Sequence, residues 1–95
     1  MASGEGYFVD ANVLVYAALK DDTRHAVCRK LLTDAEEGVL LYISPQILVE
    51  FYSAITSPKR VTAPFEPLEA VEFIERLLEF KHIVVLPVGA EVPAR

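Results

Sequence analysis

Two acidic residues, Asp10 and Glu50, stand where carboxylates could do chemistry. Asp10 directly follows the uncharged run 7–9 and precedes apolar residues at helical spacing, Val13 and Leu14 among them. Such a run is typical of a strand that helices cover on both faces. In an open parallel α/β sheet, ligands bind outside the carboxyl ends of the strands. The sequence therefore predicts that Asp10 lies at a ligand-binding edge.

Asp10 also has a purely structural interpretation. Asp is a good helix N-cap, because its side chain accepts hydrogen bonds from the first backbone N–H groups of the helix. Asn12, two residues further on, could cap the helix instead and leave Asp10 available for a ligand. Asp10 by itself leaves the two interpretations open, and the second acid favours the ligand.

Glu50 lies in a predicted helix over residues 45–56, with Ser44 as its N-cap and Pro45 as its first residue. The apolar stripe of this helix leaves Glu50 to one side, neither in the core nor plainly in solvent. Glu50 could pair there with a lysine or arginine, or lean over the strand ends toward Asp10. Mg²⁺ uses one or two protein carboxylates together with water and substrate phosphate. Such a metal can polarise a phosphodiester and help to supply hydroxide.

The elements that must position these acids alternate along one domain of 95 residues. Short uncharged runs predict strands at 7–9, 39–43 and 82–86, and apolar stripes predict helices at 12–19, 23–37, 45–56 and from Glu66 or Pro67 to about 78. Residues 1–6 are expected to be a flexible lead-in. Strands joined by helical crossovers predict an α/β fold with a parallel sheet and right-handed connections.

Two of these helices carry predicted inward stripes. The second helix, capped by Thr23 and ended by Gly38, is expected to bury Val27, Leu31, Leu32 and Ala35. The fourth helix is expected to bury Leu68, Val71, Ile74, Leu77 and Leu78.

Charge and composition limit the function. A net charge of −5 and the absence of a Lys/Arg-rich tract argue against direct nucleic-acid binding without a divalent cation. A single cysteine, Cys28, excludes a disulfide framework and favours the cytoplasm. The start of the chain does not resemble a signal peptide, and no apolar run approaches the length that spans a membrane. A hydrophobic content of 53% predicts apolar surface left over for a partner.

The segments Phe-Val-Asp-Ala-Asn-Val-Leu-Val-Tyr-Ala and Ile-Ser-Pro-Gln-Ile-Leu-Val-Glu-Phe-Tyr-Ser-Ala-Ile-Thr-Ser-Pro resemble the first two motifs of PIN-domain ribonucleases. Within that family, the segments resemble those of the VapC-like toxins of toxin–antitoxin pairs. The resemblance implies a three-layer parallel α/β fold with strand order 3-2-1 and about four helices. It also implies Mg²⁺- or Mn²⁺-dependent cleavage of RNA, with Asp10 and Glu50 as metal-binding acids. By the same resemblance, Asn12 shapes the site and Ser44 caps its helix.

The family's third and fourth acids follow a further helix, whereas this sequence ends at Arg95. The resemblance therefore implies a chain without the C-terminal part of the domain, with little or no activity of its own. It also implies an open edge on the first strand, which favours a homo-oligomer. A catalytically incomplete module that binds an antitoxin or itself is the alternative function. Lys59 and Arg60 could contact RNA phosphates, although ordinary loop solvation is the simpler explanation.

A third class, a phosphotransfer or phosphatase fold with Asp on a strand, ranks last. Such folds need a partner acid two residues after the nucleophile or an acid pair ahead of it. Asn12 and residues 7–9 supply neither.

Overall fold

A computed structural model describes residues 6–34 and 38–86 of the chain. The order of elements in these residues is β-α-α-β-α-α-β, as the sequence predicts. The strands are β1 (Gly6–Phe8), β2 (Leu40–Ile43) and β3 (Ile83–Val85), and the helices are α1 (Ala11–Ala18), α2 (His25–Thr33), α3 (Pro45–Ile55) and α4 (Pro67–Leu77). The predicted parallel α/β fold is therefore confirmed.

The sheet has the strand order β1-β2-β3, and both pairings are parallel. Tyr7 lies opposite Leu41 in the first pairing, and Leu41 lies opposite Ile83 in the second. This order is the predicted 3-2-1. Because all three strands run in the same direction, their carboxyl ends meet at one edge of the sheet, where β1 leads into α1 and β2 leads into α3.

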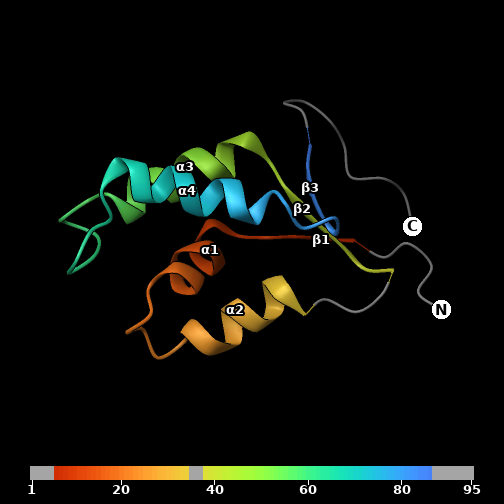
Figure 1. Cartoon of the computed structure of the whole chain (residues 1–95), viewed down its shortest axis with the longest axis horizontal. Helices are drawn as coiled ribbons and strands as arrows, with labels where there is room; N and C mark the ends of the chain where they lie inside the picture. Colours follow the sequence, from red (N-terminus) through yellow and green to blue (C-terminus); the bar gives the residue numbers. More distant parts are fainter. Residues whose placement is uncertain (1–5, 35–37, 87–95) are drawn as a thin grey trace.

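The helices form a row in which each contacts the next: α2 packs against α1, α1 against α3, and α3 against α4 (Figure 1). Leu14 of α1 and Phe51 of α3 are fully buried at the centre of this row. Phe51 also meets Phe73 of α4, with ring centroids 5.1 Å apart. Burying a side chain such as Phe51 contributes about 1.5–3 kcal/mol to stability. The core therefore fixes the position of α3 relative to α1.

β1 departs from the prediction of a strand that helices cover on both faces. Tyr7 and Phe8 point to opposite faces of the sheet, because successive side chains alternate along a strand. Both are more than half exposed, at 55% and 56%, and only Val9 is buried directly after them. Gly6 belongs to β1 rather than to the predicted lead-in, and residues 1–5 lie outside the described residues.

α2 starts later than predicted and buries less. Its first residue is His25, because the carboxylate of Asp22 accepts the backbone N–H of Arg24 at 2.8 Å and keeps the preceding residues in a turn. The predicted cap Thr23 is not used, and Val27 is 70% exposed and Leu31 47% exposed. Leu32 is the one predicted stripe residue of α2 that the structure buries, and Ala35 lies outside the described residues.

α4 begins at Pro67 as predicted, after a capping box in which the backbone N–H of Glu66 donates to Glu69 at 2.8 Å. Its inward face is Ala70, Phe73, Ile74 and Leu77. The predicted members Leu68, Val71 and Leu78 are exposed. A pattern that counts only large apolar residues overlooks Ala70, whose short side chain lets the helix approach its neighbours closely.

Candidate functional site

The β1–α1 and β2–α3 junctions lie next to each other. The ladder between the two strands ends at Phe8 and Tyr42, and the backbone N–H of Val9 then donates to the oxygen of Tyr42 at 2.9 Å. Asp10 lies two residues beyond Phe8, and Ser44 directly follows Ile43 at the end of β2. Each is the N-cap of the helix that follows. The structure therefore brings Asp10 and Ser44 to the same edge of the sheet.

Asp10 caps α1 with one carboxylate oxygen. Its Oδ1 atom accepts the backbone N–H of Asn12 at 3.4 Å, a length at the weak end of the hydrogen-bond range. The side chain is exposed and makes no other hydrogen bond or ion pair with the described residues. The capping interpretation is thus correct, and it leaves most of the acceptor capacity of the carboxylate available.

Asn12 does not cap the helix. It is the second residue of α1, and its side chain is exposed without a hydrogen bond to any residue that the structure describes. Its amide is therefore available to a ligand near the start of the helix. Its role in shaping the site stays a prediction.

Ser44 is the N-cap of α3, as the Ser-Pro start predicts. Its Oγ atom accepts the backbone N–H of Ile47 at 3.1 Å, and Pro45 follows at the first helical position. A serine hydroxyl that accepts one hydrogen bond can still donate its own proton. Ser44 therefore fixes the start of α3 and keeps a donor at the sheet edge.

Glu50 lies on α3 about 9 Å further along the helix axis than Ser44, at 1.5 Å per residue. Its side chain is exposed, and within the described ranges it has no hydrogen bond or ion pair. The interpretation of Glu50 as a boundary acid paired with lysine or arginine thus finds no support. Its carboxylate is available to a cation.

The carboxylates of Asp10 and Glu50 are of the kind that binds a hard divalent cation. Asp10 and Glu50 offer two exposed carboxylates without cationic partners among the described residues, and both Mg²⁺ and Mn²⁺ prefer such oxygen ligands. No group of three or more His, Cys, Asp or Glu residues in the described part of the chain is placed to hold a metal ion. Water and substrate phosphate would have to complete the coordination.

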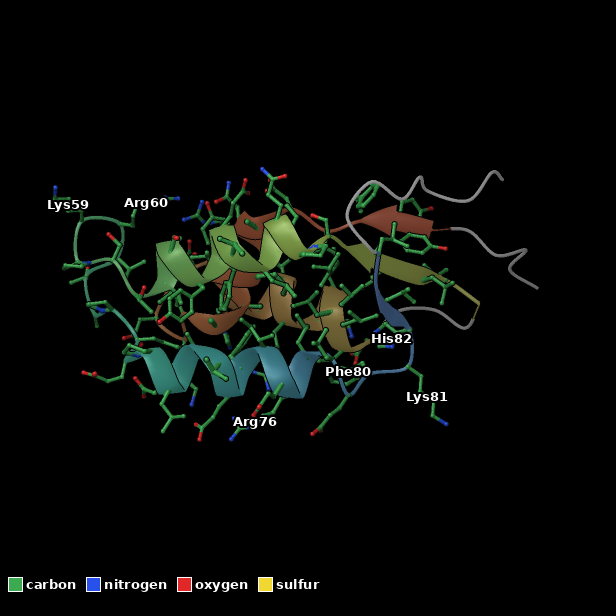
Figure 2. The ribbon with its side chains drawn as sticks, turned by 90° about the horizontal axis from the view of Figure 1, so that it is seen from above. Lys59, Arg60, Arg76, Phe80, Lys81 and His82 are labelled. Carbon is green, nitrogen blue, oxygen red and sulfur yellow. The ribbon has the colours of Figure 1, made fainter. Side chains whose placement is uncertain are left out.

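Lys59 and Arg60 lie in the loop beyond the far end of α3 (Figure 2). The 11 residues of α3 separate this loop from Ser44, which corresponds to about 16 Å of helix. Both side chains are exposed. The structure therefore does not bring them to Asp10, and a phosphate contact from this loop would involve a more distant part of an RNA strand.

Arg29 and Arg76 were not singled out by the sequence, yet both line a hollow between α1, α2 and α4. They lie on two different helices, 47 positions apart in the sequence. No local spacing could have connected them, because only the packing of the helices in the folded chain brings them to one hollow.

None of the helices in the described part of the chain combines the length and the apolar character needed to cross a membrane. A comparison with curated protein sequences finds no match. The family model of the PIN domain matches residues 7–95, which is nearly the whole chain and includes both strand-to-helix junctions. The chain therefore belongs to the PIN-domain family.

Proposed function

We propose that this protein is a Mg²⁺- or Mn²⁺-dependent endoribonuclease. Membership in the PIN-domain family indicates a nuclease-type function. The observation that carries the proposal is the position of Asp10 at the sheet edge beside Ser44, the residue that starts the helix bearing Glu50. These are the two acids that the resemblance assigns to the metal.

Each residue of the proposed site has a separate task. Asp10 and Glu50 hold the cation, which when bound would polarise the phosphodiester and lower the pKa of water. The amide of Asn12 and the hydroxyl of Ser44 orient water or phosphate oxygens by hydrogen bonds. Lys59 and Arg60 contact phosphates further along the RNA, where they offset part of the net charge of −5.

Metal binding can be tested directly with Mn²⁺, whose unpaired electrons broaden nearby NMR signals. We expect Mn²⁺ to broaden the backbone amide signals of Asn12, Ser44 and Glu50 selectively. Asp10→Asn and Glu50→Gln should each reduce this broadening, whereas Glu75→Gln, an exposed acid on α4, should not. Equal broadening in the wild type and in Asp10→Asn would contradict the proposed site.

Cleavage is the second test. With only two carboxylates in the proposed site, we expect weak metal binding and slow cleavage of single-stranded RNA by this chain. EDTA and the Asp10→Asn variant should abolish the slow cleavage, and Glu75→Gln should leave it unchanged. Cleavage that continues in Asp10→Asn would show that another site or a contaminant is responsible.

We further propose that the chain acts in the cytoplasm as the toxin of a toxin–antitoxin pair. Only the resemblance to VapC-like proteins supports this role. Expression of the chain in bacteria should then slow growth, and Asp10→Asn should restore it. Slow growth with both forms would point to aggregation rather than to ribonuclease activity.

A second candidate function is that of a binding module, and one surface favours it. Phe8, Val27 and Leu31 line an apolar hollow beside β1 and α2, and all three are exposed. In the described residues β1 pairs with β2 alone, so its other edge remains open to a strand. A second copy of the chain or an antitoxin-like protein could bind there, with or without ribonuclease activity.

A further inference from the structure

A hollow of about 330 Å³ lies between α1, α2 and α4. Its apolar floor includes Ala17, Leu32 and Leu77, which are 0%, 2% and 4% exposed. The half-buried rings of Phe73 and Phe80 line it as well. Pockets that bind small molecules begin at about 300 Å³ and combine an apolar lining with a few polar groups. The size and floor of this hollow therefore suit the apolar part of a small ligand.

Two arginines also line this hollow. Arg29 comes from α2 and Arg76 from α4, and neither guanidinium forms an ion pair or hydrogen bond with any residue described by the structure. Figure 2 places Arg76 on the side of α4 turned away from α3, with Phe80 just beyond the end of the helix. Unpaired arginines that converge on one hollow are unexpected in a chain of net charge −5.

The other charged residues that line the hollow do not neutralise the positive charge of Arg29 and Arg76. Lys20 and Glu69 line both this hollow and a neighbouring one, so they lie where the two hollows meet. The positive charge of Lys20 balances the negative charge of Glu69. Glu69 already accepts the backbone N–H of Glu66 at 2.8 Å. Glu72 is the remaining acid of the lining. The part of the hollow without Lys20 and Glu69 therefore carries two positive groups and one negative group.

We propose that this hollow binds a small amphipathic organic anion. Its carboxylate or phosphate would accept hydrogen bonds from Arg29 and Arg76, because a guanidinium donates two parallel hydrogen bonds to either group. Its aromatic or alkyl body would lie against Phe73 and Phe80. The hollow includes Ala17 and Ala18 at the end of α1, whereas Asp10 caps its start. The proposed site is thus separate from the metal-binding edge and does not depend on ribonuclease activity.

The test uses two probes with the same ring and different anionic groups, 3-phenylpropanoate and phenyl phosphate. Benzyl alcohol and inorganic phosphate are the controls that carry only the apolar or only the anionic part. We expect the anionic ring compounds to shift the amide signals of Arg29, Arg76 and Phe80 in NMR titrations, with a Kd of about 1 mM for ligands of this size. The tighter of the two probes identifies the anionic group that the site prefers.

Variants that remove a single charge then distinguish binding of the anion by the arginines from weak binding to the apolar surface alone. Arg29→Gln and Arg76→Gln should each weaken binding about tenfold, which corresponds to the loss of a charge-assisted hydrogen bond. Glu72→Gln should strengthen binding, because it removes the carboxylate that repels the anion. Arg60→Gln is the matched control, because Arg60 is exposed and does not line the hollow, and this variant should leave the affinity for both anionic probes unchanged.

Two results would overturn the proposal. One is the absence of shifts at the hollow with both anionic probes, and the other is equal affinity for benzyl alcohol and 3-phenylpropanoate. Far-ultraviolet circular dichroism of each variant confirms that the fold is retained. Since all the substituted side chains are exposed, their replacement should leave the core intact.

Discussion

His82 joins two elements that lie 50 residues apart in the sequence. Its Nε2 atom is 2.6 Å from the backbone oxygen of Leu32, one of the last carbonyls of α2, which have no partner within the helix. Because a carbonyl only accepts, Nε2 must carry the proton. The ring also meets Phe80, with centroids 5.4 Å apart. His82 therefore ties the end of α2 to the start of β3.

We predict that His82→Ala lowers the free energy of unfolding by about 1–2 kcal/mol, because it leaves the partly buried Leu32 carbonyl without its donor. Urea denaturation followed by circular dichroism measures this change. Lys81→Ala replaces the adjacent exposed side chain and should change the free energy of unfolding by less than about 0.5 kcal/mol. Equal effects of the two substitutions would show that the hydrogen bond contributes nothing.

Asp22 and Arg24 form the turn before α2, in which the Arg24 Nε atom donates to the Asp22 carboxylate at 2.9 Å. The Arg24 guanidinium also lies 3.7 Å from the centroid of the Tyr16 ring. The hydrogen bonds from Arg24 hold the pKa of Asp22 below its ordinary value of 3.8. A lowered carboxyl pKa means that the contact stabilises the turn at neutral pH and is lost as the pH falls through the lowered value.

We therefore predict an NMR titration midpoint below 3.8 for the Asp22 carboxyl carbon, and a midpoint nearer 3.8 in the Arg24→Gln variant. Asp34 is the internal control, because a hydrogen bond from Lys30 rather than from Arg24 lowers its pKa. Its midpoint should be the same in both proteins. An Asp22 midpoint that Arg24→Gln does not move would rule out the contact in solution.

α3 is the element whose start the sequence specifies most fully. Its first residue and its cap are those predicted, because Ser44 and Pro45 act locally and need no tertiary contact. We predict that Ser44→Ala lowers the free energy of unfolding by about 1 kcal/mol. Ser53→Ala, at an exposed position in the same helix, is the control for losing a serine hydroxyl and should have no such cost. Thermal and urea denaturation of both variants provide the comparison.

α2 and α4 show where sequence reasoning stops. Both helices exist near their predicted positions, but only part of each predicted buried face is buried in the structure. The reason is that periodicity locates apolar residues on a helix without showing which neighbour covers them. Val27 lies beside a strand with an open edge, and Ala70 is buried because short side chains allow close packing. Both features depend on how the helices and strands pack together, which the periodicity of one helix does not show.

The candidate site was predictable to a similar extent. The position of Asp10 at a strand end followed from residues 7–9 and the helical spacing after them, and the structure adds that Asp10 and Ser44 leave neighbouring parallel strands. The environment of Glu50 could not be predicted from the sequence. Its position beside the apolar stripe of α3 allowed either an ion pair or an exposed carboxylate. The hollow with Arg29 and Arg76 depends on three helices and left no local signal.

On the scale of the whole molecule, the feature with the largest expected effect is the edge of β1 that no described strand covers. Backbone groups point alternately to the two sides of a strand, and the N–H of Val9 points to β2. Phe8, one residue earlier, therefore directs its N–H and C=O to the open edge. The charged residues of the adjacent hollow, Lys30 and Asp34, pair with each other at 2.9 Å. The surface is thus apolar and carries no net charge that would repel a second acidic chain.

We predict that the protein self-associates through this surface. Size-exclusion chromatography with light scattering should show a molar mass that rises above 10.5 kDa as the concentration increases. Val27→Lys should restore the monomer, because it places a charge in the apolar hollow at a position that is 70% exposed and so tolerates the change in the folded chain. Leu68→Lys, on α4 at 68% exposure, is the matched control and should leave the association unchanged. A monomer at every concentration, or equal loss of association in both variants, would exclude this surface as the site of self-association.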